Sequence, residues 1–227
     1  MFSVDFSAYK DVLVYNAQLL REIFYPRRCF VCGTVIDAGC FCADCRRSFL
    51  LQMVIKDVYP LREVFLLYKY EQQLKEILHG VKFENRGILL PLLYEEAKFA
   101  LPLRPEYFFS DFDLVGCIPT SPERRKSRGF DVPERIFSFT EYDCQPRQVL
   151  ERVRNTIPLY ELEPVLRRQE LQGCFRVNMP VTGKKILLCD DIYTTGSTMK
   201  EAACALLAAG AERVSALAFA ASRDNWR

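Results

Sequence analysis

The fold is decided by residues 184–221, which read KKILLCDDIYTTGSTMKEAACALLAAGAERVSALAFAA. Two apolar runs in it, KKILLCD and RVSALAFAA, have the length and composition of buried strands in a parallel sheet. The segment between them, MKEAACALLAAG, is typical of a crossover helix that ends at Gly210. Strand, loop, helix and strand in this order form a βαβ unit. A third apolar run, FDLVGCIP, begins at residue 112. The sequence therefore predicts an α/β fold with a mostly parallel sheet.

The composition excludes several classes of protein. Half of the 227 residues are hydrophobic, and 31 Lys and Arg face 29 Asp and Glu, which gives a net charge of +2. A disordered chain, a collagen-like repeat or a strongly charged coat for nucleic acid would have a different proportion of hydrophobic and charged residues. Charged residues interrupt the first thirty positions, and no stretch reaches the roughly 18 apolar residues of a membrane span. We expect a cytoplasmic protein without membrane insertion.

The chain divides into three predicted parts. Apolar residues at three- and four-residue steps predict an amphipathic N-terminal helix over residues 1–25. A metal-binding module is expected over 26–60, and the α/β domain over 61–227. Upstream of the apolar runs, this domain has a predicted strand at 61–70 and predicted helices at 71–82 and 86–100. The length suits one ordinary domain with a small accessory module.

Five of the ten cysteines lie close together in the predicted module: Cys29, Cys32, Cys40, Cys42 and Cys45. Without a signal peptide we expect these thiols to be reduced, which favours a metal over disulfides. The pairs Cys29-x-x-Cys32 and Cys42-x-x-Cys45 have the spacing of a tetrahedral zinc site. Four protein ligands leave zinc no open position, so it would be structural. Cys40 is an alternative fourth ligand, and a cluster of buried thiols without metal is the other interpretation.

The loop after the strand KKILLCD predicts a ribose phosphate site. Asp190 and Asp191 stand at the carboxyl end of that strand, where open α/β sheets bind ligands, and paired carboxylates accept hydrogen bonds from vicinal hydroxyls. A hydroxyl-rich loop at a helix N-terminus follows, and such a terminus favours a phosphate. This loop consists of Thr194, Thr195, Gly196, Ser197 and Thr198. The alternative is an ordinary helix cap, which accounts for one or two of these residues.

Here the sequence resembles a known family. The string LLCDDIYTTGST is similar to the signature with which type I phosphoribosyltransferases bind 5-phosphoribosyl 1-pyrophosphate (PRPP). From Cys29 onward, the order of a zinc ribbon, VKFENR, IPTSPERRKSRGF, RRQELQGCFRV and the PRPP loop resembles the ComF family. That family is similar to phosphoribosyltransferases and is linked to natural competence for DNA uptake.

The resemblance implies roles for individual residues. Asp190 and Asp191 would hold the ribose hydroxyls, directly or through Mg²⁺, and the loop from Thr194 to Thr198 would hold the 5-phosphate. Residues 61–105 would form the family's hood element. The pyrophosphate would bind to a loop and to the basic residues that follow it. The alternative interpretation of these basic residues is a solvated surface loop. The loop and the basic residues are Pro119, Thr120, Ser121, Arg124, Arg125, Lys126 and Arg128.

Two departures from the family pattern concern the same loops. After RGF the family usually continues with Asn-Gln, whereas this chain has Asp131, Val132 and Pro133. Many purine-salvage enzymes carry an aspartate where Thr194 stands, and a threonine cannot act alone as a general base. The chain is therefore expected to bind the sugar phosphate without salvaging a purine.

The segment VKFENR and the histidine before it each have two interpretations. Lys82, Phe83 and Arg86 either project toward the PRPP loop, to contact a base or a nucleic acid strand, or form an ordinary helix end. His79 is the only histidine, which excludes metal sites that need several histidines. We expect it to end a helix over 71–79 and to interact with the helix dipole.

The sequence thus predicts a ComF-like protein that binds PRPP, or another sugar phosphate, with Mg²⁺. Transfer of the phosphoribosyl group to an unknown acceptor, with release of pyrophosphate, would make it a phosphoribosyltransferase. The alternative is a non-catalytic accessory of DNA uptake that contacts a competence helicase or single-stranded DNA.

Overall fold

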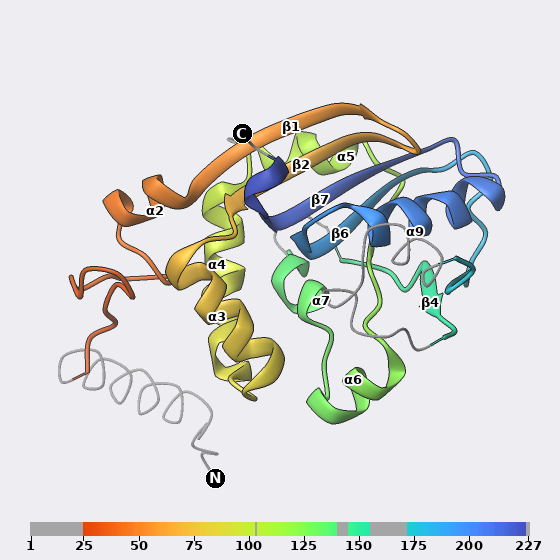
Figure 1. The fold of residues 1–227 in the computed structure, drawn as a ribbon. Coiled ribbons are helices and arrows are strands. Elements are labelled where there is room, and N and C mark those ends of the chain that lie inside the picture. Colours follow the sequence, from red (N-terminus) through yellow and green to blue (C-terminus); the bar gives the residue numbers. More distant parts are fainter. Residues whose placement is uncertain (1–24, 103, 140–144, 155–171, 226–227) are drawn as a thin grey trace, which may run out of the picture.

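A five-stranded sheet forms the centre of the molecule (Figure 1). The computed structural model describes residues 25–102, 104–139, 145–154 and 172–225. The strand order is β1-β2-β7-β6-β3, in which β1 is antiparallel to β2 and the other pairs are parallel. The strands are β1 (Leu50–Val58), β2 (Leu61–Lys69), β3 (Leu114–Cys117), β6 (Lys185–Tyr193) and β7 (Arg213–Ala221). The predicted α/β fold with a mostly parallel sheet is confirmed.

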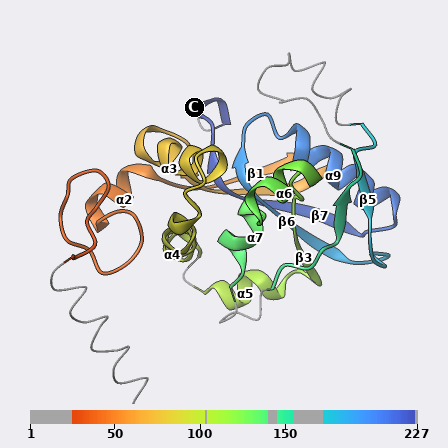
Figure 2. The same ribbon diagram turned by 90° about the horizontal axis from the view of Figure 1, so that it is seen from below.

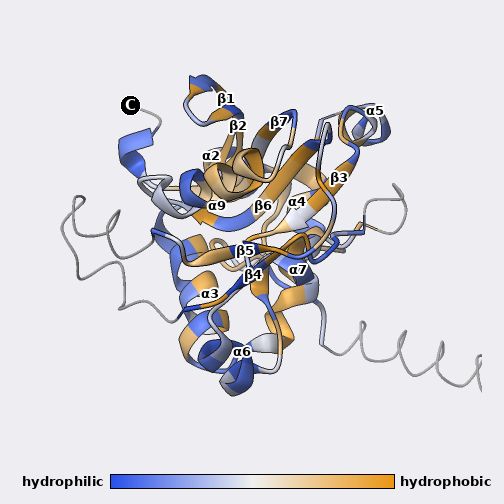
Figure 3. Cartoon of the chain, turned by 90° about the vertical axis from the view of Figure 1, so that its right-hand side faces the viewer, coloured by the Kyte–Doolittle hydropathy of each residue, from blue (hydrophilic) through white to orange (hydrophobic). Residues whose placement is uncertain are grey.

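Side chains along the central strands point alternately to the two faces of the sheet, and they build a hydrophobic core on each face. Leu187 and Leu217 point to the face that packs against α3 (Gln72–Phe83), α4 (Leu90–Ala100) and α7 (Val132–Phe137). Leu188 and Ala216 point to the opposite face, against α9 (Ser197–Ala208). Figure 3 shows hydrophobic colour along the central strands and a mainly hydrophilic α6 (Pro122–Arg128). Burial on both faces explains why these strands are continuous apolar runs.

The remaining elements lie around this three-layered centre. A separate antiparallel pair, β4 and β5, contacts α9. Figure 2 places α2 at the opposite end of the molecule from α9 and β5. The elements not yet introduced are α2 (Ala43–Phe49), η1 (Gly87–Leu89), α5 (Pro105–Ser110), β4 (Leu150–Arg152), β5 (Phe175–Val177) and η4 (Arg223–Asn225).

The predicted elements and part boundaries can be located in the structure. The N-terminal helix predicted over 1–25 lies almost wholly outside the described residues. The boundary predicted at residue 60 falls in the turn between β1 and β2, two strands paired from Leu50↔Tyr68 to Val58↔Leu61. β2, which the prediction assigned to the hood, pairs with β7 in the central sheet. In the described part of the chain, no helix has the length and apolar character needed to cross a membrane.

Two predicted helices differ in detail. The helix predicted over 71–82 is α3, which runs through His79 and Gly80 to Phe83, so the terminal position expected for His79 is wrong. Gly80 lies inside α3, where Cδ of Arg86 is 2.9 Å from the position that a Cβ would take. Glycine leaves room for this side chain. The helix expected over 86–100 is the short η1 followed by α4, which has a proline in its first turn.

Candidate functional site

A cavity of about 760 Å³ opens at the carboxyl ends of β3 and β6. Its walls come from these strand ends, from the segments that follow them and from α3. Asp190, Asp191, Thr194 and Thr198 lie on one wall. Parallel strand ends are where open α/β sheets bind ligands. The structure therefore brings the two predicted parts of the sugar phosphate site into one space.

The acidic pair belongs to β6 itself, which continues to Tyr193. The Asp191 amide donates to Asp190 Oδ1 at 2.9 Å, and Lys82 Nζ donates to Asp191 Oδ1 at 2.7 Å. Asp191 is only 7% exposed. Burial, helped by the negative charge of Asp191, raises the pKa of the Asp190 carboxyl to about 8. Asp191 is thus a buried acceptor with one cation already in contact, and Asp190 beside it is half-buried.

The loop from Thr194 to Thr198 turns sharply from β6 into α9. Gly196 is the N-cap residue with φ of +72°, and a Cβ there would lie 2.3 Å from Tyr193 Oη. Only glycine fits both the backbone angle and this close approach. Thr195 Oγ1 and Ser197 Oγ share a hydrogen bond of 2.8 Å in the turn. The helix N-terminus is thereby fixed beside the acidic pair.

The carboxyl end of the described chain braces this loop. Asn225 Nδ2 donates to the carbonyl of Thr194, and the Ser222 amide donates to the carbonyl of Tyr193 at 3.0 Å. These contacts give the carbonyls of Tyr193 and Thr194 fixed partners. They could not be predicted from the sequence, because Asn225 lies 31 residues from Thr194 and carries no local motif.

The segment after β3 forms the facing wall. Pro119, Thr120, Ser121, Arg124 and Arg128 all line the cavity, as a pyrophosphate site requires. They lie in the turn after β3 and in α6. Lys126 is not among the lining residues.

Arg125 is oriented away from this cavity. Its Nη1 lies 3.4 Å from Asp131 Oδ2, and the Thr120 amide donates to Asp131 Oδ1 at 3.2 Å. Asp131 is 5% exposed. Asp131, which departs from the family pattern, thus supports the loop between β3 and α6 from the side away from the cavity, and does not line the cavity.

Helix α3 supplies the third wall. Lys82 and Phe83 line the cavity, and the Arg128 guanidinium lies 5.6 Å from the Phe83 ring centroid. Arg86 points elsewhere, because its Nη2 pairs with Glu84 Oε2 at 2.8 Å. Two of the three residues singled out in VKFENR therefore line the same cavity as Thr194 and Thr198.

Among the lining residues that were not predicted, four have polar side chains: Tyr70, Lys75, His79 and Arg152. Lys75, His79 and Lys82 recur at helical spacing along α3, on the side next to the buried Leu74 and Leu78. That spacing was the available signal. Arg152 comes from β4, and no local pattern marks it. The predicted segment RRQELQGCFRV is described only from residue 172, where it enters β5.

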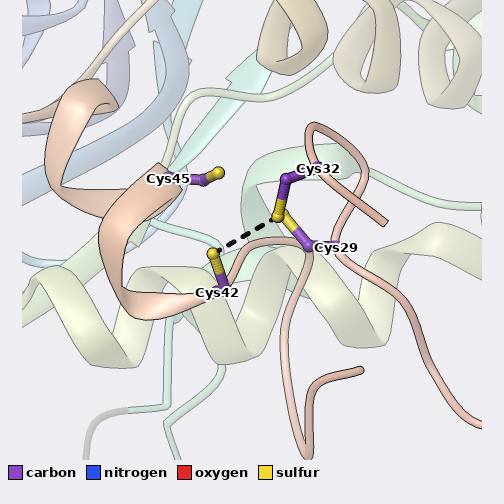
Figure 4. A group of neighbouring side chains, drawn as sticks. All are labelled: Cys29, Cys32, Cys42 and Cys45. Atoms are coloured by element: carbon purple, nitrogen blue, oxygen red, sulfur yellow. Dashed lines mark hydrogen bonds between the residues drawn. The ribbon is translucent and has the colours of Figure 1, made fainter. Parts of the chain in front are cut away.

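The four predicted zinc ligands converge (Figure 4). The sulfurs of Cys29, Cys32, Cys42 and Cys45 all lie within 4.8 Å of one another. Hydrogen bonding from Thr34 lowers the pKa of Cys32 to about 6, which favours the thiolate that metals bind. Four thiolates are the donor set of structural zinc, so the cluster could bind that ion.

Cys40 is not part of the cluster. It is fully buried, and its amide donates to Glu96 Oε1 at 2.7 Å. Burial raises the pKa of its thiol well above the ordinary range, so it is a poor thiolate ligand. The alternative of Cys40 as the fourth ligand is therefore not supported by the geometry.

Glu96 joins the cysteine module to the α/β domain. This carboxylate, fully buried on α4, pairs with Arg46 Nε at 2.7 Å and accepts a hydrogen bond from Tyr68 Oη at 3.0 Å. The amide of Phe41 also donates to it, at 3.1 Å. A buried charge needs partners on every side, and here they come from the module and from β2.

Comparison with known proteins agrees with this architecture. Residues 149–227 match the phosphoribosyl transferase domain family. A DNA utilization protein YhgH of Salmonella typhi is 30% identical over 174 residues, covering 68% of this chain and 70% of the relative. YhgH of Escherichia coli K12 is 27% identical over the same shares.

A relative from another bacterium has a different name. Competence protein ComFC of Bacillus subtilis is 29% identical over 186 residues, covering 80% of this chain and 72% of the relative. This chain therefore belongs to the ComF family, whose members carry a phosphoribosyltransferase-like domain.

Proposed function

We propose that this protein binds PRPP with Mg²⁺ in the cavity and transfers the phosphoribosyl group to an acceptor. One observation carries the proposal. The acidic pair on β6, the phosphate-type loop before α9 and the arginines of α6 line a single cavity of about 760 Å³. These three groups match the hydroxyls, the 5-phosphate and the pyrophosphate of PRPP.

The β6 wall would hold the sugar. Asp190 and Asp191 would accept hydrogen bonds from the vicinal ribose hydroxyls. The backbone N–H groups at the start of α9, with Thr194 and Thr198, would receive the 5-phosphate. Because Gly196 and Asn225 fix this loop, the anomeric carbon would be held at a constant position relative to the facing wall.

The facing wall would hold the leaving group. In the reaction, an electron pair of the acceptor forms a bond to the anomeric carbon, and the bond from that carbon to pyrophosphate breaks. Pyrophosphate leaves with the electron pair, and its growing negative charge would face Arg124 and Arg128. Preorganised cations at that position lower the barrier because they stabilise the charge as it develops.

The donors also fit a magnesium ion. Mg²⁺ prefers carboxylate oxygens, and Asp191 Oδ1 already contacts a cationic group, the Lys82 ammonium. When bound by Asp190 and Asp191, Mg²⁺ would supply charge neutralisation for the bound PRPP. In the N-terminal module, Cys29, Cys32, Cys42 and Cys45 would hold structural zinc, which contributes to folding and not to chemistry.

Calorimetric titration with PRPP, with and without Mg²⁺, tests the proposal. We expect saturable binding that depends on Mg²⁺ and is abolished in the double variant Asp190→Asn/Asp191→Asn. Asp57→Asn is the matched control, because it removes one exposed carboxylate on β1 outside the cavity wall. Absence of PRPP binding at millimolar concentration would contradict the proposal.

A second candidate function is an accessory role in DNA uptake through single-stranded DNA or a competence helicase. The names of the relatives, DNA utilization protein and competence protein, favour it, as does the basic α6 with Arg124, Lys126 and Arg128. Fluorescence anisotropy with labelled oligothymidine at rising salt tests the DNA form. We expect affinity to fall steeply with salt, and less steeply in Lys126→Gln, which leaves the cavity wall intact.

A further inference from the structure

We infer, on the basis of the proposed function, that His79 is the general base that takes the proton of the acceptor, and that Glu84 positions its ring. This adds a catalytic residue to the same cavity. It also gives a task to the segment HGVKFENR at 79–86, of which the walls for PRPP involve only Lys82 and Phe83.

His79 belongs to a chain of contacts at the end of α3. Its Nδ1 lies 3.3 Å from Glu84 Oε1, and Glu84 Oε2 pairs with Arg86 Nη2 at 2.8 Å. A carboxylate only accepts hydrogen bonds, so Nδ1 of the neutral ring carries the proton and Nε2 keeps its lone pair. The ring also packs against Phe83, with 4.9 Å between the centroids. A histidine oriented by a carboxylate in this way is prepared to accept a proton at its second nitrogen.

The backbone after α3 is shaped for these contacts. The amides of Glu84 and Arg86 both donate to the carbonyl of Gly80, at 3.0 and 3.1 Å. Between them, Asn85 has a φ of +55°, a left-handed conformation that asparagine adopts more readily than most residues. The missing side chain at Gly80 leaves room for Arg86 against the helix. The chain therefore turns back on α3 and returns Glu84 and Arg86 to His79.

His79 lies on the wall that reaches the expected sugar site. It lines the cavity, and Lys82, one helical turn further along α3, donates to Asp191 Oδ1 at 2.7 Å. Residues three apart on a helix are neighbours, with about 5–6 Å between their Cβ atoms. Arg124 and Arg128, which would receive the pyrophosphate, come from α6. The base and the cations for the leaving group are thus supplied by different elements.

The other titratable groups among the described lining residues are less suited to accept a proton at neutral pH. Asp190 and Asp191 would be engaged with the ribose hydroxyls, and lysine and arginine side chains ordinarily carry their protons at this pH. Burial, helped by the charge of Asp191, raises the pKa of Tyr70, so its phenol stays protonated. Thr194 cannot act alone as a general base. Histidine ordinarily changes its charge near neutral pH, and His79 is the only one in the chain.

The step moves one proton. An electron pair of an N–H or O–H group of the acceptor forms the bond to the anomeric carbon, and the bond from that carbon to pyrophosphate breaks with its electron pair. The proton of the acceptor passes to Nε2 of His79. The ring then carries a positive charge, which the carboxylate of Glu84 stabilises from Nδ1.

Charged and titratable groups surround His79 on its own helix, on the segments next to it and on the other walls of the cavity. All of them contribute to the pH at which the ring changes its charge. Besides Glu84 they are Tyr70 before α3, Lys75, Glu76 and Lys82 on α3, Arg86 after it, Arg124 and Arg128 on α6, Arg152 on β4, and Asp190 and Asp191 on β6.

Hydrolysis of PRPP, with water as the acceptor, tests the base without knowledge of the natural acceptor. Release of pyrophosphate by the full chain with Mg²⁺ is followed across pH. A base works in its unprotonated form, so we expect the rate to fall as the pH drops through the range in which histidines gain a proton, around pH 6.5. In His79→Gln the rate at about pH 8 should fall about a hundredfold and should no longer vary in that range. PRPP affinity, measured by calorimetry, should be retained.

The positioning role of Glu84 is tested in the same assay. Glu84→Gln keeps an acceptor oxygen and loses the charge, so kcat for hydrolysis should fall about tenfold while KM for PRPP stays unchanged. The matched control is Glu106→Gln, which removes an exposed carboxylate on α5 outside the cavity wall. It should change neither kcat nor KM, and an equal loss in the two variants would contradict a specific role of Glu84.

The outcomes separate this inference from the proposed function. Equal rates in the parent protein and His79→Gln would overturn the inference while PRPP binding stands. A pH dependence that survives the substitution, or a parent rate no higher than that of PRPP in buffer alone, would do the same. Failure of the parent protein to bind PRPP would instead overturn the proposed function, and this inference with it.

Discussion

The amide of Thr120 donates a hydrogen bond to the buried carboxylate of Asp131, which also pairs with Arg125. The loop on the expected pyrophosphate side is thus held from behind by a residue that does not itself line the cavity. Gly129, with φ of +78°, ends α6 and lets the chain turn back so that Asp131 can reach the loop.

Removing this support should weaken the loop. Asp131→Ala leaves the Thr120 amide without an acceptor in a partly buried position, so we expect the free energy of unfolding to fall by about 1–3 kcal/mol. PRPP affinity should fall about tenfold, the equivalent of about 1.4 kcal/mol. Urea denaturation and calorimetry measure the two effects. Asp131→Asn keeps an acceptor oxygen and should lose less stability and less PRPP affinity. Losses as large as those of Asp131→Ala would contradict this explanation.

The loop before α9 should not tolerate a side chain at Gly196. Gly196→Ala meets both a positive φ and a contact of 2.3 Å with Tyr193 Oη. The matched control is Gly183→Ala, whose φ is +68° with nothing within 4 Å of the new Cβ. Both variants should lose about 1–2 kcal/mol of stability from the backbone angle. Gly196→Ala alone should lose PRPP binding, and equal PRPP affinity in the two variants would show that the close approach to Tyr193 is unimportant.

The cysteine cluster should hold one metal ion through four sulfurs. Cys29→Ser removes one of them, so we expect loss of bound zinc and a lower melting temperature, because structural zinc contributes directly to folding. Elemental analysis and thermal unfolding measure these effects. Cys40→Ser is the control that separates the cluster from the buried thiol beside it. It should retain zinc, and zinc loss in Cys40→Ser would mean that the ligand set is different.

Glu96 should contribute far more stability than its neighbour Glu95. Glu96→Gln weakens a buried ion pair with Arg46 and leaves buried donors imperfectly matched, for which we expect a loss of about 3–5 kcal/mol. Glu95 is one-third exposed and lies 3.9 Å from Lys98, so Glu95→Gln should cost no more than about 1 kcal/mol. Denaturant unfolding of the two variants side by side measures the difference. Similar losses would contradict the anchoring role of Glu96.

The parts of the molecule that could be predicted are those encoded locally. The βαβ unit at 184–221 shows its own periodicity, and its acids and loop residues are consecutive in sequence. The two cysteine pairs are likewise recognised by spacing alone. In each of these cases, one short segment contains both the structural signal and the chemical groups.

The parts that were missed or left open depend on contacts between distant segments. Lys82 reaches Asp191 across 109 residues, and Glu96 reaches Cys40 across 56. The partner of a buried charge is not visible in one sequence, because burial itself is set by the tertiary fold. The supporting role of Asp131 was hidden for the same reason. Its carboxylate, which departs from the family pattern, is turned toward Thr120 and Arg125 and away from the cavity.

Lys82 and Asp191 join two cavity walls that lie far apart in the sequence. The cavity walls come from the first half of the chain, through α3, and from its last third, through β6 and α9. A ligand that touches all walls binds only when these distant segments are packed together, so its binding energy adds to the cooperativity of folding. At a ligand concentration of 100 times Kd this amounts to about 2.7 kcal/mol. Protection of the whole chain against heat or proteolysis would therefore report occupancy of the cavity, without any knowledge of the reaction.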